Sequence, residues 1–188
     1  VEERDSCMRL TVQLTAAQDV YFNYRQLLST GYRHDNCQFY MPGFWYRRNL
    51  RSPKKAPSFH TSDSWLVRED RLSAPLTGIF SEKEKRFMTV NRLDDFSMDA
   101  LATHKEGEII LSGKTSLGFT GFENQQGIAM LSFGFPYREA PKSYIRKLTL
   151  APEVEAFQLM KKGESVLLTW EIMESGADDF SDFIQHTW

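Results

Sequence analysis

Hydrophobic and polar residues alternate along much of this chain, which is the pattern of half-buried β-strands. Residues 7–14 alternate without a break, and residues 164–173 do so again. In residues 19–27, Val20, Phe22 and Tyr24 lie on one side and Tyr21, Asn23 and Arg25 on the other. We expect the first and third of these segments, which are separated by a short break, to pair as antiparallel neighbours in a meander.

Further strand-like segments follow at short spacing, with glycine-containing turns between them. They are residues 64–67, 76–80, 86–93, 98–104, 108–116, 127–135 and 144–150. Residues 29–64 differ, because their prolines and glycines interrupt any period, and they are predicted to form a long loop with at most short strands. The segment Gly118–Gly121 (GFTG) is interpreted as a turn.

Two segments are predicted to be helical. Residues 154–160 follow Pro152 and precede Gly163, which favours one short internal helix. At the C-terminal end, Phe180, Phe183, Ile184 and Trp188 recur at helical spacing after Asp178 and Asp179, which are suited to cap the helix N-terminus.

Many short strands and few helices indicate an all-β fold, an antiparallel β-sandwich of super-sandwich-like architecture. The lack of alternating strands and helices disfavours a parallel nucleotide-binding sheet. We assign residues 1–176 to the sandwich and residues 177–188 to the start of a linker helix. That helix has two interpretations: it packs back on this domain, or it leads toward a further domain.

Composition narrows the classes of partner. The 188 residues carry a formal net charge of −2, so no overall basic field favours nucleic acid or a membrane surface. No apolar stretch approaches the roughly 20 residues of a membrane span.

The N-terminus and the cysteines leave two questions open. The chain begins at Val1, which fits either a removed presequence, and then a periplasmic or extracellular location, or a start within a longer product. Whether Cys7 and Cys37 form a disulfide stays open.

Catalytic and metal signatures do not emerge from the sequence. The four histidines show no HExxH or HxH spacing, and no GxSxG, Walker or GxGxxG pattern occurs, so we expect no metal and no cofactor. Acidic residues that fall in or near predicted loops are candidates for a glycosidase pair, but sequence does not measure their separation and no catalytic pair is assigned. They are Asp63, Glu69, Asp70, Asp94, Asp95, Glu123 and Glu139.

The most distinctive constellation is aromatic and basic. Flat aromatic rings stack on sugar rings, and arginines donate hydrogen bonds to hydroxyls or carboxylates, so this combination favours a carbohydrate ligand. The alternative is that the rings pack into the core and the arginines are solvated. Binding of single-stranded nucleic acid is disfavoured by the net charge. The candidate substrate-binding residues are Phe44, Trp45, Tyr46, Arg47, Arg48, Trp65 and Arg68.

The strand-rich body up to Met173, the loop with GFWYRRN and the ending DDFSDFIQHTW together resemble one known group of domains. This group is the N-terminal β-sandwich domain of glycoside hydrolases with an (α/α)6 barrel, the six-hairpin type. The resemblance implies an accessory domain that supports a C-terminal catalytic barrel, lends a loop to the substrate cleft and has no hydrolytic activity alone. It also implies that an apolar patch including Phe183 and Trp188 is exposed or used in oligomer contacts in the isolated domain.

Two alternatives to this accessory role stay open. The first is a free-standing carbohydrate-binding module with no catalytic partner, in which the aromatic loop forms the whole site. The second is a complete small β enzyme that uses acids from its loops.

Overall fold

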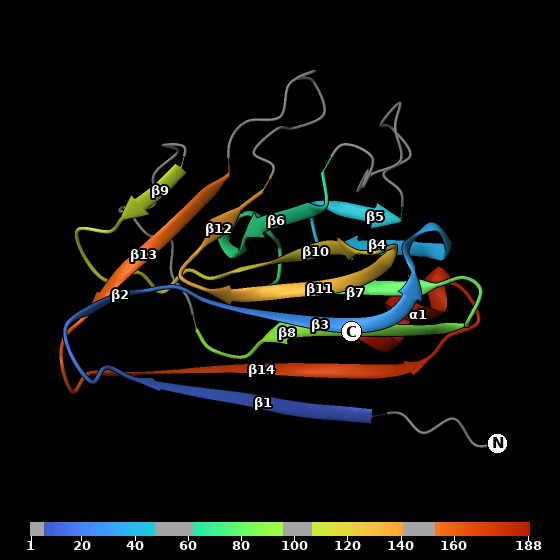
Figure 1. Cartoon of the computed structure of the whole chain (residues 1–188). Coiled ribbons are helices and arrows are strands. Elements are labelled where there is room, and N and C mark those ends of the chain that lie inside the picture. The colour runs from blue at the N-terminus through green and yellow to red at the C-terminus, as the bar shows by residue number, and fades with distance from the viewer. Residues whose placement is uncertain (1–5, 48–61, 96–106, 141–152) are drawn as a thin grey trace.

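Three β-sheets and one C-terminal helix make up the computed structural model (Figure 1). The structure describes residues 6–47, 62–95, 107–140 and 153–188. A six-stranded sheet packs on a four-stranded sheet, and a smaller third sheet lies beside them. The predicted antiparallel sandwich is therefore confirmed.

The six-stranded sheet is antiparallel throughout, and its strands follow one another in the order β1 (Ser6–Thr15), β14 (Ser165–Gly176), β8 (Arg86–Arg92), β7 (Leu76–Ser81), β4 (Cys37–Met41) and β5 (Trp45–Arg47). The four-stranded sheet has the order β3 (Tyr24–Arg33), β11 (Ile128–Phe135), β10 (Phe119–Gln125) and β6 (Ser64–Arg68). The 3₁₀ turns η1 (His34–Asn36) and η2 (Glu69–Arg71) follow β3 and β6.

The third sheet is built around β13 (Val154–Met160), which pairs antiparallel with β12 (Arg138–Glu139) and β2 (Val20–Phe22). Its remaining partner, β9 (Gly107–Ile110), runs parallel to it. Because β2 leads into β3 and β11 leads into β12, this sheet continues the four-stranded one.

The main core lies between the two larger sheets and is filled by alternate residues of their strands. Aromatic rings meet across it: the centroids of Phe39 and Phe122 are 4.8 Å apart, and those of Phe133 and Trp170 are 5.1 Å apart. On β14, Leu168, Trp170 and Ile172 are buried, as the alternation predicts.

The predicted meander is wrong, because β1 pairs with β14 and not with residues 19–27. Those residues divide at Asn23 into β2, which pairs with β13, and the start of β3, which pairs with β11. Apolar alternation identified each strand correctly, but long-range pairing decided the partners.

The predicted internal helix over residues 154–160 is wrong, because this segment is β13. Buried and partly exposed residues alternate along it, with Val154, Ala156, Gln158 and Met160 buried. The segment contains residue types that favour a helix, but hydrogen bonding to three other strands outweighs this local preference.

The predicted loop over residues 29–64 is wrong in its first part. Strand β3 extends to Arg33, and β4 and β5 form a hairpin in which Phe39, Tyr40 and Met41 are buried. Residues 48–61 lie outside the described residues. The predicted turn at residues 118–121 is also wrong, because Phe119–Gln125 forms β10. The predicted strands over residues 98–104 and 144–150 lie outside the described residues as well.

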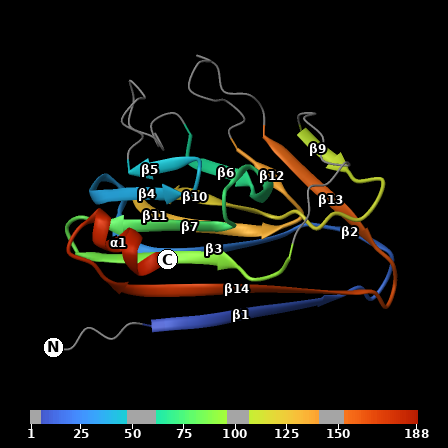
Figure 2. The same ribbon diagram turned by 180° about the vertical axis from the view of Figure 1, so that it is seen from behind.

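The C-terminal helix is confirmed as α1 (Phe180–Thr187). Asp179 caps it by accepting hydrogen bonds from the backbone N–H groups of Ser181 and Asp182. The helix lies on the outward side of the six-stranded sheet (Figure 2). There Phe183 contacts the ring of Phe87, with centroids 4.9 Å apart.

A glycine makes this docking possible, because a Cβ atom on Gly78 would lie 2.6 Å from Cζ of Phe183. The expectation that Phe183 is exposed is therefore wrong: it is fully buried against the sheet. Trp188 is 72% exposed, and its indole N–H donates a hydrogen bond to the hydroxyl of Tyr40. The helix packs on this domain, as one of its two interpretations requires.

The two cysteines are free thiols, one exposed on β1 and one buried on β4. Four strand spacings, about 19 Å, separate these strands within the sheet, and a disulfide needs Cα atoms within about 7 Å. The open question of a Cys7–Cys37 bridge is thus answered by the sheet order.

Replacing Phe183 with alanine is expected to destabilise the protein by about 3–5 kcal/mol, because it empties the contact between α1 and the sheet. Urea unfolding followed by circular dichroism measures this loss. Trp188→Ala is the matched control and is expected to change stability by less than about 1 kcal/mol. Equal losses in the two variants would show that α1 does not dock through Phe183.

Candidate functional site

The predicted aromatic and basic site is described only in part. Phe44 and Trp65 are half-buried and pack against the main core, and the indole N–H of Trp65 donates to the carbonyl of Ser62 at 3.2 Å. Trp45, Tyr46 and Arg47 form β5, but their side chains, together with Arg48, lie outside the described residues. For Phe44 and Trp65, the observed packing matches the interpretation in which the rings fill the core.

Arg68 does not share a face with Trp65, because residues three apart on a strand point to opposite sides of the sheet. Its guanidinium holds both carboxylate oxygens of Asp70, at 2.6 and 2.9 Å, and lies 5.4 Å from the centroid of the Tyr137 ring. The structure therefore does not bring Arg68 and Trp65 to one site.

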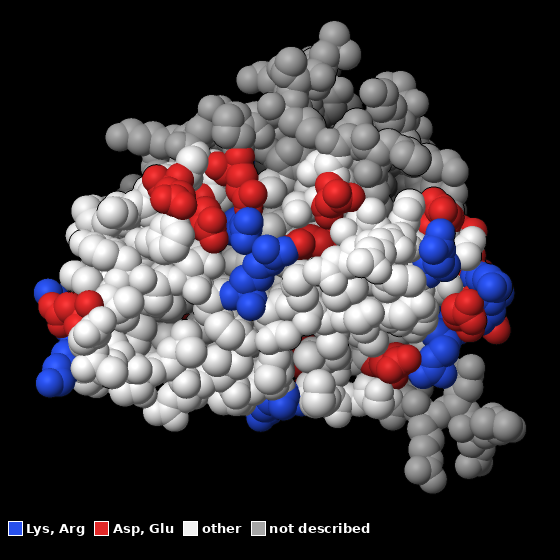
Figure 3. Space-filling view, viewed as in Figure 1, with Lys and Arg blue, Asp and Glu red and all other residues white. Residues whose placement is uncertain are grey.

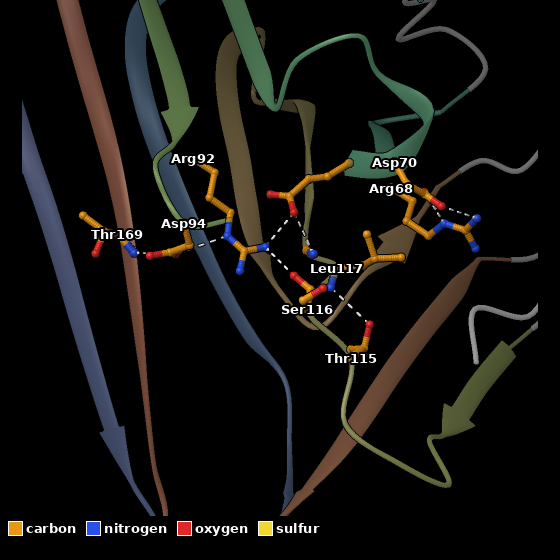
Figure 4. Close-up of polar contacts among 10 residues, drawn as sticks. Arg68, Asp70, Arg92, Asp94, Thr115, Ser116, Leu117 and Thr169 are labelled. Atoms are coloured by element: carbon orange, nitrogen blue, oxygen red, sulfur yellow. Dashed lines mark hydrogen bonds and ion pairs between the residues drawn. The ribbon is translucent and has the colours of Figure 1, made fainter. Parts of the chain in front are cut away.

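A buried polar network joins the two larger sheets (Figure 4). Arg92, at the end of β8, donates through Nη1 to Oε2 of Glu69 at 2.6 Å, and the same oxygen accepts from the backbone N–H of Gly118 at 2.7 Å. Arg92 Nε lies 3.2 Å from Asp94, which accepts from the backbone N–H of Thr169. Burial raises the pKa of Glu69, while Arg92 and the Gly118 N–H lower it in part. Oε1 of Glu69 has no hydrogen-bond partner among the described residues. The other charged groups satisfy one another and nearby backbone groups, so we assign the network to structure.

Other acids that the sequence offers for catalysis are also matched to arginines. Arg71 Nη2 donates to Glu139 at 3.2 Å, and Arg25 forms an ion pair with Glu123. In the described parts of the chain, no three His, Cys, Asp or Glu side chains gather in a way that suits a metal ion. Among the candidate acids, Glu69, Asp70, Asp94, Glu123 and Glu139 thus form ion pairs with arginines, whereas Asp63 accepts a hydrogen bond from the side-chain amide of Asn124.

A different group of residues shares one continuous sheet surface. Side chains of alternate residues on a strand point to the same side of the sheet. On the side away from the main core lie Tyr21 of β2, Arg25 of β3, Ser132 and Gly134 of β11, and Arg138 of β12. We call this surface the outer face and define it by Tyr21, Arg25, Ile110, Glu123, Ser132, Arg138, Glu155, Phe157 and Leu159.

One half of the outer face is apolar and aromatic. Tyr21 is 49% exposed and Ile110 is 66% exposed, and they flank β13. The strand register places Leu159 opposite Tyr21 and Phe157 opposite Ile110, so the four side chains form a row across the small sheet. A flat row of this kind suits stacking against a planar or ring-shaped ligand.

The other half of the outer face is charged. Arg25 on β3 reaches Glu123 on β10 across β11, where Ser132 and Gly134 leave the path free of bulky side chains. Arg138 pairs with Glu153 and lies 3.6 Å from Glu155. Burial lowers the pKa of Arg138, but the hydrogen bond and charge of Glu153 raise it above the usual arginine value, so this guanidinium stays charged.

Two acceptors in this charged half lack hydrogen bonds within the described structure. They are Oε1 of Glu123 and Oγ of Ser132, and both side chains are more than nine-tenths buried. An unpaired buried polar atom costs about 1–3 kcal/mol, so at these two atoms the hydrogen bonding that the described residues supply is incomplete.

Figure 3 views the outer face from the same side as Figure 1. Acidic and basic side chains gather near its middle and toward β9, and a largely uncharged surface extends below and to their left, along β13. The charged and apolar halves are thus adjacent parts of one surface.

The chain was compared with protein-family models, curated proteins and solved structures. No match was found. The function is therefore argued from the outer face itself. Within the described residues, no helix is long and apolar enough to cross a membrane.

Sequence reasoning found part of the outer face and missed the rest. Alternation placed Tyr21 and Arg25 on one side of their segment, which the structure confirms. Phe157 and Leu159 were assigned to a helix, although the run Val154–Met160 alternates in burial with period two. Polarity along this run does not alternate, because the buried Gln158 is polar and the outward Phe157 and Leu159 are apolar, so no local signal identifies them.

Glu69→Gln and Arg92→Met are each expected to cost about 3–5 kcal/mol of stability, because each leaves a buried polar partner unmatched. The double variant is expected to lose less than the sum, since neither partner is then left alone. Urea unfolding of all four proteins in a double-mutant cycle measures the coupling. Lys114→Met, which removes an exposed ion pair with Glu164, serves as control and leaves the unfolding midpoint unchanged. Strictly additive losses would contradict a direct Glu69–Arg92 interaction.

Proposed function

We propose that this chain binds carbohydrate on its outer face, as the accessory β-sandwich of a glycoside hydrolase with an (α/α)6 catalytic barrel. One observation carries the binding proposal. Exposed Tyr21 and half-buried Phe157 lie on the same surface as two buried acceptors, on Glu123 and Ser132, that have no hydrogen-bond partner among the described residues.

The aromatic half supplies the apolar contact that a sugar needs. The C–H groups on one side of a pyranose ring form a flat apolar surface, which packs against an aromatic face. Tyr21 and Phe157 sit on a sheet and not on a loop, so little side-chain freedom is lost when a ligand stacks on them.

The charged half supplies hydrogen bonds of the matching kind. Sugar hydroxyls donate and accept, so a hydroxyl that reaches these atoms can donate to Oε1 of Glu123 and exchange a hydrogen bond with Ser132. Both atoms are covered in the described structure, so the side chains above them must move when a ligand binds. Arg25 and Arg138 hold their carboxylate partners in place and present remaining N–H groups to the same area. Ligand binding would thereby satisfy acceptors that the described structure leaves unmatched.

The accessory role is supported by the confirmed antiparallel sandwich and by the resemblance in the strand-rich body. The C-terminal segment does not support it, because Phe183 of α1 is buried against this domain's own sheet. In that role the candidate residues Trp45, Tyr46, Arg47 and Arg48 add contacts near the substrate cleft, whereas Phe44 packs against the core. The alternative is a free-standing module, and it is favoured by one observation: the outer face lies wholly within this chain. Binding by the isolated chain is expected for a free-standing module and for the outer-face site, whereas a loop that only completes the cleft of a catalytic barrel is not expected to bind without that barrel.

Tyr21→Ala is expected to weaken glycan binding about tenfold or more, because it removes the exposed ring of the stacking row. Isothermal titration against a panel of soluble polysaccharides measures the change. Leu167→Ala is the matched control, since Leu167 is 58% exposed but lies on the outward side of the other sheet.

Trp45→Ala separates the two candidate locations. Full binding in Tyr21→Ala together with lost binding in Trp45→Ala would place the ligand at the loop and not on the outer face. No binding of any polysaccharide by the native chain would refute the carbohydrate proposal for the isolated domain.

Ser132→Ala is expected to act in opposite directions on stability and binding. It removes a buried hydroxyl without a partner, so the free protein gains about 1 kcal/mol of stability, while glycan affinity falls several-fold. Thermal unfolding and titration measure the two effects, and Ser165→Ala at an exposed position on β14 is the control. A stability gain with unchanged affinity would exclude Ser132 from the site.

A further inference from the structure

Strand β1 forms a free edge of the six-stranded sheet. Its ten residues pair with β14 in unbroken register, from Ser6 opposite Glu174 to Thr15 opposite Ser165. Among the described strands, β14 is the only partner of β1, so one full side of its backbone is left for another strand.

This edge lacks the features with which proteins usually block strand pairing. Such features are proline, lysine, inward-pointing charge, bulges and short length. Strand β1 is long and regular, contains no proline, and carries one charged residue, Arg9, which lies on the side away from the core.

Apolar side chains continue to the edge on the core side of β1. Leu10 and Val12 are half-buried and pack against the main core, and Met8 is 53% exposed. A further strand beside β1 would extend this apolar row and cover it.

We propose that β1 pairs antiparallel with β1 of a second copy of this chain, which joins two six-stranded sheets edge to edge about a two-fold axis. With Thr11 on the axis, Met8 faces Leu14 and Leu10 faces Val12 on the core side. On the other side Arg9 faces Gln13. Apolar residues therefore meet apolar residues, polar residues meet polar residues, and no like charges face each other.

The self-complementary pattern favours a second copy over an unrelated peptide strand. Antiparallel pairing about a two-fold axis makes every contact occur twice, so one strand sequence must match its own reverse. A register centred on Arg9 would place two guanidinium groups opposite each other, and a shift by one residue would mix the two faces. The Thr11 register avoids both problems.

Sedimentation equilibrium of the native chain over a range of concentrations tests the proposal. The expected result is a reversible monomer–dimer equilibrium. Thr11→Lys places two ammonium groups opposite each other on the axis and is expected to raise the dimer dissociation constant about tenfold or more. Thr11 is exposed, so the fold tolerates this change, and circular dichroism checks it.

Cysteine cross-linking tests the register independently of Thr11→Lys. In a Cys7→Ser background, Thr11→Cys is expected to form an intermolecular disulfide on mild oxidation, because paired Cα atoms lie about 4.5–5.5 Å apart. Arg9→Cys is the matched control and is not expected to cross-link, since two copies of residue 9 are offset by four positions.

Three results would overturn the proposal. They are a monomer at all concentrations, a dimer that Thr11→Lys leaves intact, and equal cross-linking of Thr11→Cys and Arg9→Cys. Dimer formation that is lost in Thr11→Lys, with selective cross-linking at position 11, supports it.

Discussion

Among the described residues, a buried ion pair between Glu69 and Arg92 joins the two large sheets at one end. Water is excluded there, so each charge depends on the other and on nearby backbone groups for its stabilisation. The pair links the end of β8 to the turn that follows β6, and through Gly118 to the start of β10. Because Asp94 extends the same network to β14, the relative position of four strands follows from one arrangement of charges. The apolar core fills the space between the sheets but does not by itself specify how they are aligned along their strands.

On the opposite side of the four-stranded sheet, small residues control what the outer face can do. Strand β11 places Ser132 and Gly134 where Arg25 crosses toward Glu123. Larger side chains there would separate the charged groups. The third sheet grows from the same strands, and its outward row of apolar side chains meets the charged half at Arg138. Stacking and hydrogen-bonding groups are thus neighbours because β11 leads directly into β12.

Much of the fold was accessible from alternation, and most of the site was not. Regular apolar spacing predicted β1, β14 and the sandwich, since a strand that is buried on one side has an apolar residue at every second position.

Strand β13 was missed because Glu155, Ala156 and Gln158 are good helix formers, and its three partners come from distant segments. Strand β10 was missed because Gly118, just before it, and Gly121, within it, resemble a turn. Gly121 is needed for close packing, since a Cβ at this position would lie 2.1 Å from the carbonyl oxygen of Trp65. Arg25 and Glu123 are 98 residues apart in the sequence, so no local pattern predicts the ion pair between them.

The contact between Gly78 and Phe183 makes the residues allowed at two distant positions of the sequence depend on each other. A side chain at position 78 and a phenylalanine at position 183 exclude each other, so neither residue can change freely while the other remains. Among relatives of this chain, a larger residue at the first position should therefore be accompanied by a smaller residue at the second, or by a different placement of the terminal helix. If the residues at these two positions vary together among related sequences, α1 packs on the same part of the sheet in those proteins, and this can be inferred without their structures.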